Sequence, residues 1–345
     1  MMHSDHSILR RRSPPSISPA EATPGPGRDE VRPSGFNEKG EIVSKILVTG
    51  ASGDLGRKTV LHLLERRPAS ELVGLARDPS KAADLTAKGV EIRQGDYFEP
   101  SSLWQAFKGV ERLMLTSTHA FTDRKTAQAN VIDAAVNAGV RHLVSMSIIR
   151  KPGSTYTMPE ITDEDKFTEQ KLAKSGLDYT VAYHPPFIDY LGFSVGMKAQ
   201  ETGVNIPVPG YGKFAPASRY DLAAAHAAIL TGKGHEGKSY QLYGDPAVSF
   251  RDVAAIISKL SGEPVAYNQI SDEAFIELVK AAGVPDFVGE FAIRWIKGMD
   301  AGEWAPLGSD LEKLLGRKPA STEETMRTTY FQPVARLKET FAADL

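Results

Sequence analysis

The chain has 345 residues, of which 41% are hydrophobic and none is cysteine, so disulfides, thiolate nucleophiles and cysteine-based zinc sites are excluded. Its 41 basic and 43 acidic residues are mixed along the chain and give a formal net charge of -2. No basic stripe therefore points to direct nucleic-acid binding. No run of 18 apolar residues exists, and we expect no membrane-spanning segment.

The first segment of the chain, residues 1–44, is rich in proline, glycine and charged residues and poor in apolar ones. Such a composition buries too little apolar surface to offset the entropy of ordering, so we expect a disordered N-terminal extension. No apolar stretch follows Arg10, Arg11 and Arg12, which argues against a targeting signal. We therefore expect a cytoplasmic protein with a solvated tail.

The stretch Lys45–Val60 joins a short apolar run to a glycine-rich turn and then to a helical pattern that opens at Arg57. Glycines fall at Gly50, Gly53 and Gly56. In such a turn the backbone amides face a phosphate at close range, where a Cβ would intrude, and the helix N-terminus adds a favourable dipole. The Gly-x-x-Gly-x-x-Gly spacing is weak evidence alone, but its place between strand and helix predicts a pyrophosphate site.

A second apolar strand is expected at Leu72–Ala76, and it ends at Arg77. At this position a carboxylate would accept from the ribose 2'-hydroxyl of NAD, whereas an arginine pairs with the 2'-phosphate of NADP. Lys81 lies four residues further on, close enough on a turn or helix to add a second positive charge. We therefore expect NADP(H) as the cofactor, the alternative being an arginine that faces solvent at a strand end.

Strands continue to alternate with helices as far as residue 183. Asp96 follows the third strand, where its carboxylate would accept from the adenine amino group, Ser117 follows the fourth strand, and Ser145 ends the fifth. This alternation predicts right-handed crossovers and a doubly wound parallel sheet, with the ligand across the carboxyl ends of the strands. The third to sixth strands are expected at Val90–Gln94, Leu113–Thr116, His142–Ser145 and Tyr179–Tyr183.

Beyond residue 183 the rhythm loosens into helices and short strands. We expect an α/β protein with a Rossmann-like NAD(P)-binding domain, residues 45–183, and a smaller α/β cap, residues 184–345, that binds substrate and is interleaved with the sheet edge. Ser249 with Asp252 predicts a capping box. Four aromatic residues either line the substrate pocket or pack in the core, the second being the commoner role: Phe287, Phe291, Trp295 and Trp304.

Several segments together resemble the NmrA-like branch of the atypical short-chain dehydrogenase/reductases, and within it the triphenylmethane reductase and type 2 quinone oxidoreductase group. They are VTGASGDLG (48–56), LVGLARDPSKA (72–82), GVEIRQGDY (89–97), LAKSGLDYT (172–180), GHEGKSYQL (234–242) and LLGRKP (314–319). The resemblance implies an NADPH-dependent reductase of quinones, dyes or related acceptors, or a redox-sensing relative. The cofactor-binding residues that motif and resemblance predict are Gly50, Ser52, Gly53, Asp54, Leu55, Gly56, Arg77, Lys81, Asp96, Tyr97, Thr116, Ser117, Thr118, Ser145, Tyr183 and Pro185.

The chain departs from this family at the expected nicotinamide end. Relatives carry a lysine or histidine four residues before the glutamate that aligns with Glu169, and here that place is Asp165, with Lys166 beside it. The strand-six arginine of relatives falls at Tyr183, with His184 next. Lys166 and His184 are the catalytic candidates. Lys166 either replaces the missing base or faces solvent, and His184 either donates a proton or stacks on the nicotinamide, or is satisfied at a strand end.

The sequence lacks a common catalytic acid, and this absence indicates the class of hydride acceptor. None of the 11 tyrosines has a lysine four residues later, so the Tyr-x-x-x-Lys pair of ordinary short-chain dehydrogenases is absent. The reduced oxygen of a quinone is phenol-like, with a pKa of about 10, and can take its proton from water. We therefore expect a reductase of small-molecule acceptors without a metal. The alternative is an NADP(H)-sensing regulator without turnover, and a homodimer is left open.

Overall fold

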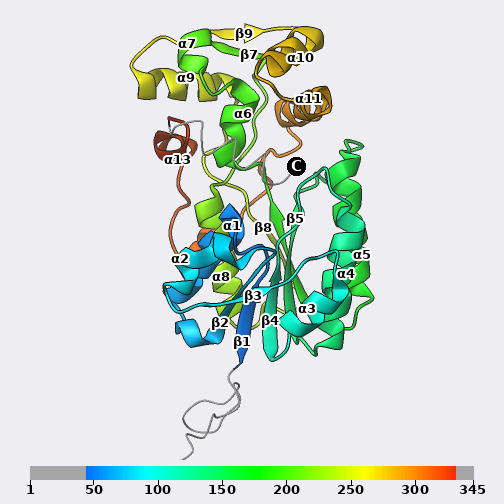
Figure 1. The fold of residues 1–345 in the computed structure, drawn as a ribbon. Helices are drawn as coiled ribbons and strands as arrows, with labels where there is room; N and C mark the ends of the chain where they lie inside the picture. Colours follow the sequence, from blue (N-terminus) through cyan, green and yellow to red (C-terminus); the bar gives the residue numbers. More distant parts are fainter. Residues whose placement is uncertain (1–43, 332–345) are drawn as a thin grey trace, which may run out of the picture. The chain divides into compact units, whose positions relative to one another are not determined.

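A seven-stranded parallel sheet forms the centre of the computed structural model, which describes residues 44–331. The predicted disordered extension lies outside this range except for Ser44. The strand order is β3-β2-β1-β4-β5-β6-β8 (Figure 1). The strands are β1 (Lys45–Val48), β2 (Leu72–Ala76), β3 (Glu91–Gln94), β4 (Val110–Leu115), β5 (His142–Ile148), β6 (Asp178–His184) and β8 (Ser239–Gln241).

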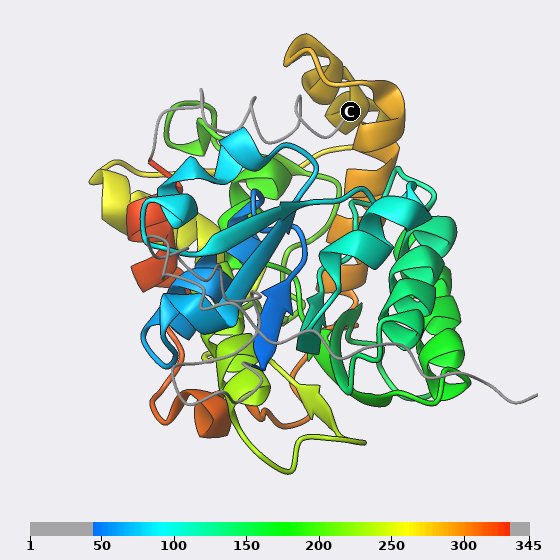
Figure 2. The same cartoon turned by 60° about the horizontal axis from the view of Figure 1, so that its bottom comes forward.

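Helices cover both faces of the sheet, as Figures 1 and 2 show. Side chains alternate between the two faces along a strand, so Ile46 and Val48 of β1 pack on one layer and Leu47 on the other. The first layer contains α1 (Asp54–Leu64), α2 (Ala83–Thr86), α8 (Arg219–Thr231) and α12 (Leu311–Leu315). The second layer contains α3 (Pro100–Ala106), α4 (Arg124–Asn137) and α5 (Glu164–Ala173).

This architecture confirms the predicted doubly wound α/β fold, while some strand ends differ from the prediction. β5 continues to Ile148, because Ser147 pairs with Tyr183 and Ile148 with His184 across to β6. The prediction ended that strand at Ser145, where polar residues begin. The carboxyl end of β5 is therefore further along the chain, and Ser147, not Ser145, lies close to it.

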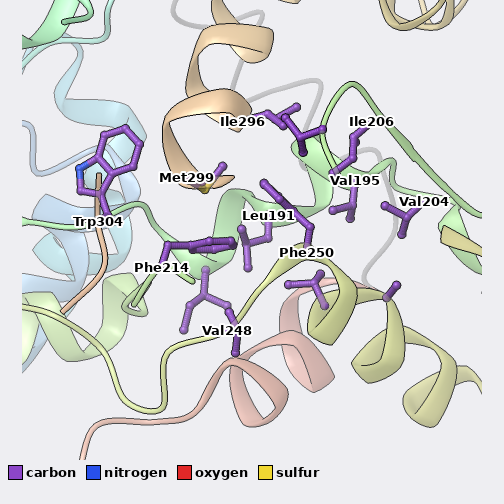
Figure 3. Packing of buried hydrophobic residues seen from close by; sticks show 14 of the residues in the cluster. Leu191, Val195, Val204, Ile206, Phe214, Val248, Phe250, Ile296, Met299 and Trp304 are labelled. Carbon is purple, nitrogen blue, oxygen red and sulfur yellow. The ribbon is translucent and has the colours of Figure 1, made fainter. Parts of the chain in front are cut away.

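A second hydrophobic core belongs to the cap. Figure 3 shows Leu191, Phe214, Phe250, Met299 and Trp304 packed together in it. Its elements are α6 (Leu191–Val195), α7 (Ala199–Thr202), β7 (Val204–Ile206), α9 (Phe250–Ser261), β9 (Tyr267–Gln269), α10 (Asp272–Ala281), α11 (Asp286–Asp300) and α13 (Thr322–Thr329). Shorter turns of helix are η1 (Ala69–Glu71), η2 (Pro79–Ala82), η3 (Pro159–Asp163) and η4 (Ile188–Tyr190).

Two features of the cap bear on the predictions. The capping box at the start of α9 is present, since the Ser249 hydroxyl accepts from the Asp252 amide and the Asp252 carboxylate accepts from the Ser249 amide. β7 was not predicted, and it pairs in parallel with β9. The chain after residue 184 also returns to the main sheet, supplying α8 and β8. The expected interleaving of the cap with the sheet edge thus involves α8 and β8, and the division at residue 183 stays a prediction.

Candidate active site

The glycine turn lies at the end of β1, where the strand order reverses between β1 and β4. Gly50 has a φ of 64°, which favours glycine, and the Gly53 amide donates to its carbonyl at 2.9 Å. A Cβ on Gly56 would lie 2.3 Å from the Gly50 carbonyl oxygen, so only glycine fits there. Gly53 precedes α1, whose N-terminus has no side-chain cap. The turn is therefore shaped to receive a phosphate.

The segment after β2 carries Arg77 and Lys81, the two residues predicted to contact the 2'-phosphate. Arg77 and Lys81 are both exposed, Arg77 directly after the strand and Lys81 on η2. Asp78 lies between them in the sequence, and its carboxylate accepts from the Ser80 amide at 3.0 Å and the Ser80 hydroxyl at 2.7 Å. These bonds lower the pKa of Asp78. The Asp78 carboxylate thus caps η2.

Three side chains lock β1 to β4 beside the turn. The Tyr97 hydroxyl lies 2.5 Å from the Thr49 hydroxyl and donates to the Thr116 carbonyl at 2.8 Å. The Thr116 hydroxyl donates to the Thr49 carbonyl at 2.9 Å. The polar atoms of Tyr97 and Thr116 therefore bond to the protein itself, and both residues shape the site. Asp96, beside Tyr97, accepts from the Phe98 amide at 2.9 Å and caps a turn.

The loop after β4 carries Ser117 and Thr118. The Ser117 hydroxyl lies 3.4 Å from the side-chain oxygen of buried Gln128, which also accepts from the Thr168 hydroxyl at 2.9 Å. Thr118 accepts from the Thr122 hydroxyl at 2.7 Å. These bonds fix the loop over the start of α4.

A polar cluster fills the ends of β5 and β6, and Glu169 of α5 is at its centre. The Glu169 carboxylate accepts from Ser147 at 2.6 Å, from Tyr183 at 3.1 Å and from the Arg150 guanidinium at 2.9 and 2.6 Å. Burial raises the pKa of Tyr183 to about 12, and the Glu169 carboxylate adds to the effect. Ser145 lies deeper in the sheet, is 1% exposed and bonds to the Met146 carbonyl. That placement argues against contact between Ser145 and the cofactor.

The two predicted catalytic side chains lie elsewhere. Lys166 faces solvent, with 51% of its side chain exposed, and pairs with Asp163 at 3.4 Å. Its neighbour Asp165 takes the inward position and forms a buried ion pair with Arg124. Asp165 also accepts from the Ile148 amide at 2.8 Å. The one-residue shift in the helix therefore turns Lys166 away, as the second of the two predicted alternatives requires.

His184 is 2% exposed, and its Nε2 lies 2.8 Å from the Nε2 of His226 on α8. Burial lowers the pKa of both imidazoles, that of His226 to about 3. His184 points to the α1/α8 layer, because it is the neighbour of Tyr183, which points to α5. A buried neutral imidazole on that face argues against proton donation by His184. Pro185 is also buried, directly after the strand.

An aromatic row connects the loop after β4 with the cap. The Phe121 ring lies 5.0 Å from Phe287 and 5.1 Å from Phe291, both on α11. Trp295 stacks on Phe291 at 6.1 Å. Trp304 is 1% exposed and donates to the Ile149 carbonyl, so it belongs to the core. Phe121 was missed, because a single aromatic residue in a loop carries no periodic signal.

Arg219 at the start of α8 is a further residue that sequence reasoning did not find. Its Nε lies 3.0 Å from the Asp54 carboxylate in the first turn of α1 and 3.5 Å from Asp189 of the cap. Its guanidinium lies 4.4 Å from the centre of the Tyr190 ring. Arg219 thus joins the helix of the glycine turn to the cap. No periodic or motif signal marks such a contact between distant segments.

The fold and the glycine turn define a dinucleotide-binding α/β protein. The profile of the NAD(P)H-binding family matches residues 50–233, and the chain belongs to that family. Among residues 44–331 no group of three His, Asp or Glu side chains could hold a metal ion, and no helix is long and apolar enough to cross a membrane.

Three relatives place the chain more closely. It is 36% identical to quinone oxidoreductase 2 of Escherichia coli (strain K12) over 282 residues, covering 81% of this chain and 97% of that protein. NAD(P)H azoreductase of Xenophilus azovorans is 32% identical over 247 residues, 71% of this chain and 84% of that one. The Citrobacter sp. triphenylmethane reductase complexed with NADP(H) has a TM-score of 0.76 and 31% identity, covering 83% of this chain and 100% of that one. These findings confirm the predicted family and cofactor.

Proposed function

We propose that this protein is an NADPH-dependent reductase that transfers hydride to a quinone, a dye or a related conjugated small molecule. The observation that carries the proposal is the aromatic row of Phe121, Phe287 and Phe291, which comes from the loop after β4 and from the cap. In this fold the ligand lies at the carboxyl ends of the strands, so the row stands at the nicotinamide end. Flat conjugated acceptors pack well against aromatic rings.

The role of the protein's own residues is to bind the cofactor and to orient it toward the acceptor. The amides of the glycine turn and the α1 N-terminus hold the pyrophosphate, and Arg77 with Lys81 selects the 2'-phosphate. The Glu169 cluster with Arg150 and Tyr183 fixes the ends of β5 and β6, at the sheet edge where the nicotinamide would bind. When bound, NADPH would supply the hydride, and a quinone oxygen would take its proton from water. We therefore propose catalysis by orientation and exclusion of water, without a dedicated general acid.

The names of the relatives support this proposal, since they are a quinone oxidoreductase, an azoreductase and a dye reductase. The proposal includes a cytoplasmic location, because a chain without cysteine needs no oxidising compartment. The proposal also includes a homodimer. Light scattering of the purified protein measures its molecular mass and tests this part.

The deciding experiment measures NADPH oxidation with a panel of quinones, azo dyes and triphenylmethane dyes. We expect turnover with at least one class, and a lower rate with NADH. Arg77→Glu should reverse or erase the preference for NADPH, while Lys88→Glu, an exposed charge reversal further along the same segment, should leave it unchanged. Tight NADPH binding without oxidation of any acceptor would instead identify a nucleotide-sensing regulator.

A further inference from the structure

Arg57, on the first turn of α1, joins two segments that the nucleotide must bridge. Its Nη2 donates to the Ser52 carbonyl in the glycine turn at 3.3 Å and to the Lys81 carbonyl after β2 at 2.5 Å. Its Nη1 forms an ion pair with Asp84 at the start of α2. One guanidinium therefore ties the pyrophosphate turn to the segment that carries Arg77 and Lys81.

The Asp84 carboxylate offsets the positive charge of the Arg57 guanidinium. The hydrogen bond from Arg57 holds the pKa of Asp84 below its usual range, so the carboxylate stays ionised and the pair persists at neutral pH. Since the charge of Arg57 is balanced by Asp84, its main effect on a bound phosphate is exerted through the position of the two carbonyls. An arginine suits this role, because its rigid fork presents two nitrogens to separate acceptors, which a lysine ammonium on a flexible stem does not reproduce.

We propose that Arg57 is a positioning residue for NADP(H) selectivity, which holds the Arg77 to Lys81 segment at the distance from the glycine turn that the 2'-phosphate requires. The inference rests on the proposed NADPH-dependent function. Holding the segment before the nucleotide arrives lowers the entropy that binding must overcome. The benefit falls on ligands that carry the 2'-phosphate, because a nucleotide without it makes no contact with the two cations.

The experiment is calorimetric binding of four ligands to the full chain: NADP+, NAD+, 2',5'-ADP and 5'-AMP. Arg57→Ala should weaken NADP+ and 2',5'-ADP about tenfold, the effect of about 1.4 kcal/mol, and NAD+ and 5'-AMP by less than about threefold. Arg57→Lys should weaken the same two ligands, because it restores charge but not the fork. Arg67→Ala is the matched control, since Arg67 pairs with Glu71 at 3.6 Å beyond the other end of α1, and it should change nothing.

The outcomes separate this inference from the function on which it rests. A wild-type protein that binds NAD+ as tightly as NADP+ overturns both. A wild-type preference for NADP+ that survives in Arg57→Ala overturns the inference alone, even if the melting temperature falls. Full rescue by Arg57→Lys shows that charge and not geometry matters, and also overturns it. Should Arg57→Ala fail to fold, Arg57→Lys carries the test, because it keeps a positive charge beside Asp84 but loses the fork that reaches the Ser52 and Lys81 carbonyls, and an unchanged preference for NADP+ in this variant overturns the inference.

Discussion

The buried ion pair between Arg124 of α4 and Asp165 of α5 gives the sharpest prediction on stability. Arg124 is 5% exposed and Asp165 2%. Asp165→Asn keeps the side-chain volume and the acceptor for the Ile148 amide but leaves the arginine charge buried without its partner. Breaking one side of a buried pair costs about 3–5 kcal/mol. With an unfolding entropy of about 2.1 cal/mol/K per residue over about 290 described residues, the melting temperature should fall by about 5–8 °C.

Urea unfolding and thermal melting of the purified protein measure this loss. Asp163→Asn is the control, because Asp163 lies at the start of the same helix in an exposed pair with Lys166, and its loss should cost less than about 1 kcal/mol. Replacing both partners, Arg124→Met with Asp165→Leu, should cost less than Asp165→Asn, because no unpaired charge remains. The reasoning would be refuted if Asp165→Asn lowered the free energy of unfolding by less than about 1 kcal/mol, or if the double variant lost more stability than Asp165→Asn alone.

Three further predictions follow from the site. Burial lowers the pKa of His226 to about 3, against about 6.5 in an unfolded chain, so between these pH values the unfolded state binds the extra proton and stability falls as pH falls. His226→Gln should flatten that slope by about 1.4 kcal/mol per pH unit in urea titrations at pH 6 and 5, and an unchanged slope would contradict it. Gly56→Ala should abolish NADPH binding, because the new Cβ would meet the Gly50 carbonyl at 2.3 Å, and retained affinity would show that the turn can shift. Phe291→Ala should raise the acceptor KM several-fold with the NADPH KM unchanged, and steady-state kinetics that move only the NADPH KM would place the acceptor elsewhere.

The nucleotide half of the molecule was predictable because its signals are local. An apolar run, three glycines and a helical pattern follow one another in sequence, and the structure places β1, the turn and α1 in that order. Arg77 and Asp96 were predicted in the same way, and the structure places each one or two residues after a strand, while their contacts with the cofactor stay predictions. Parallel strands then bring these ends to one edge without any further information.

The nicotinamide end was less predictable, because it depends on contacts between distant segments. Glu169 gathers Ser147, Arg150 and Tyr183 from two strand ends and the loop between them, and no spacing in the sequence marks that cluster. Which of two adjacent helical residues points inward is also a packing outcome, and here Asp165 is the buried one. The end of a strand is also hard to predict, and because β5 continues three residues beyond Ser145, Ser147 and not Ser145 lies near the edge of the sheet.

The order in which the chain supplies its sheet has a consequence for synthesis. Six strands are complete at His184, but α8, which covers Val144 and Ala182 on one face, ends only at Thr231. At about 5–20 residues per second, roughly 2–10 seconds separate these two points on the ribosome. During that interval the part of this face around Val144 and Ala182 lacks its α8 cover while the first part of the cap is being made. The amino-terminal half therefore cannot finish folding ahead of the rest, and nascent chains that stall before Thr231 are the ones that should engage chaperones.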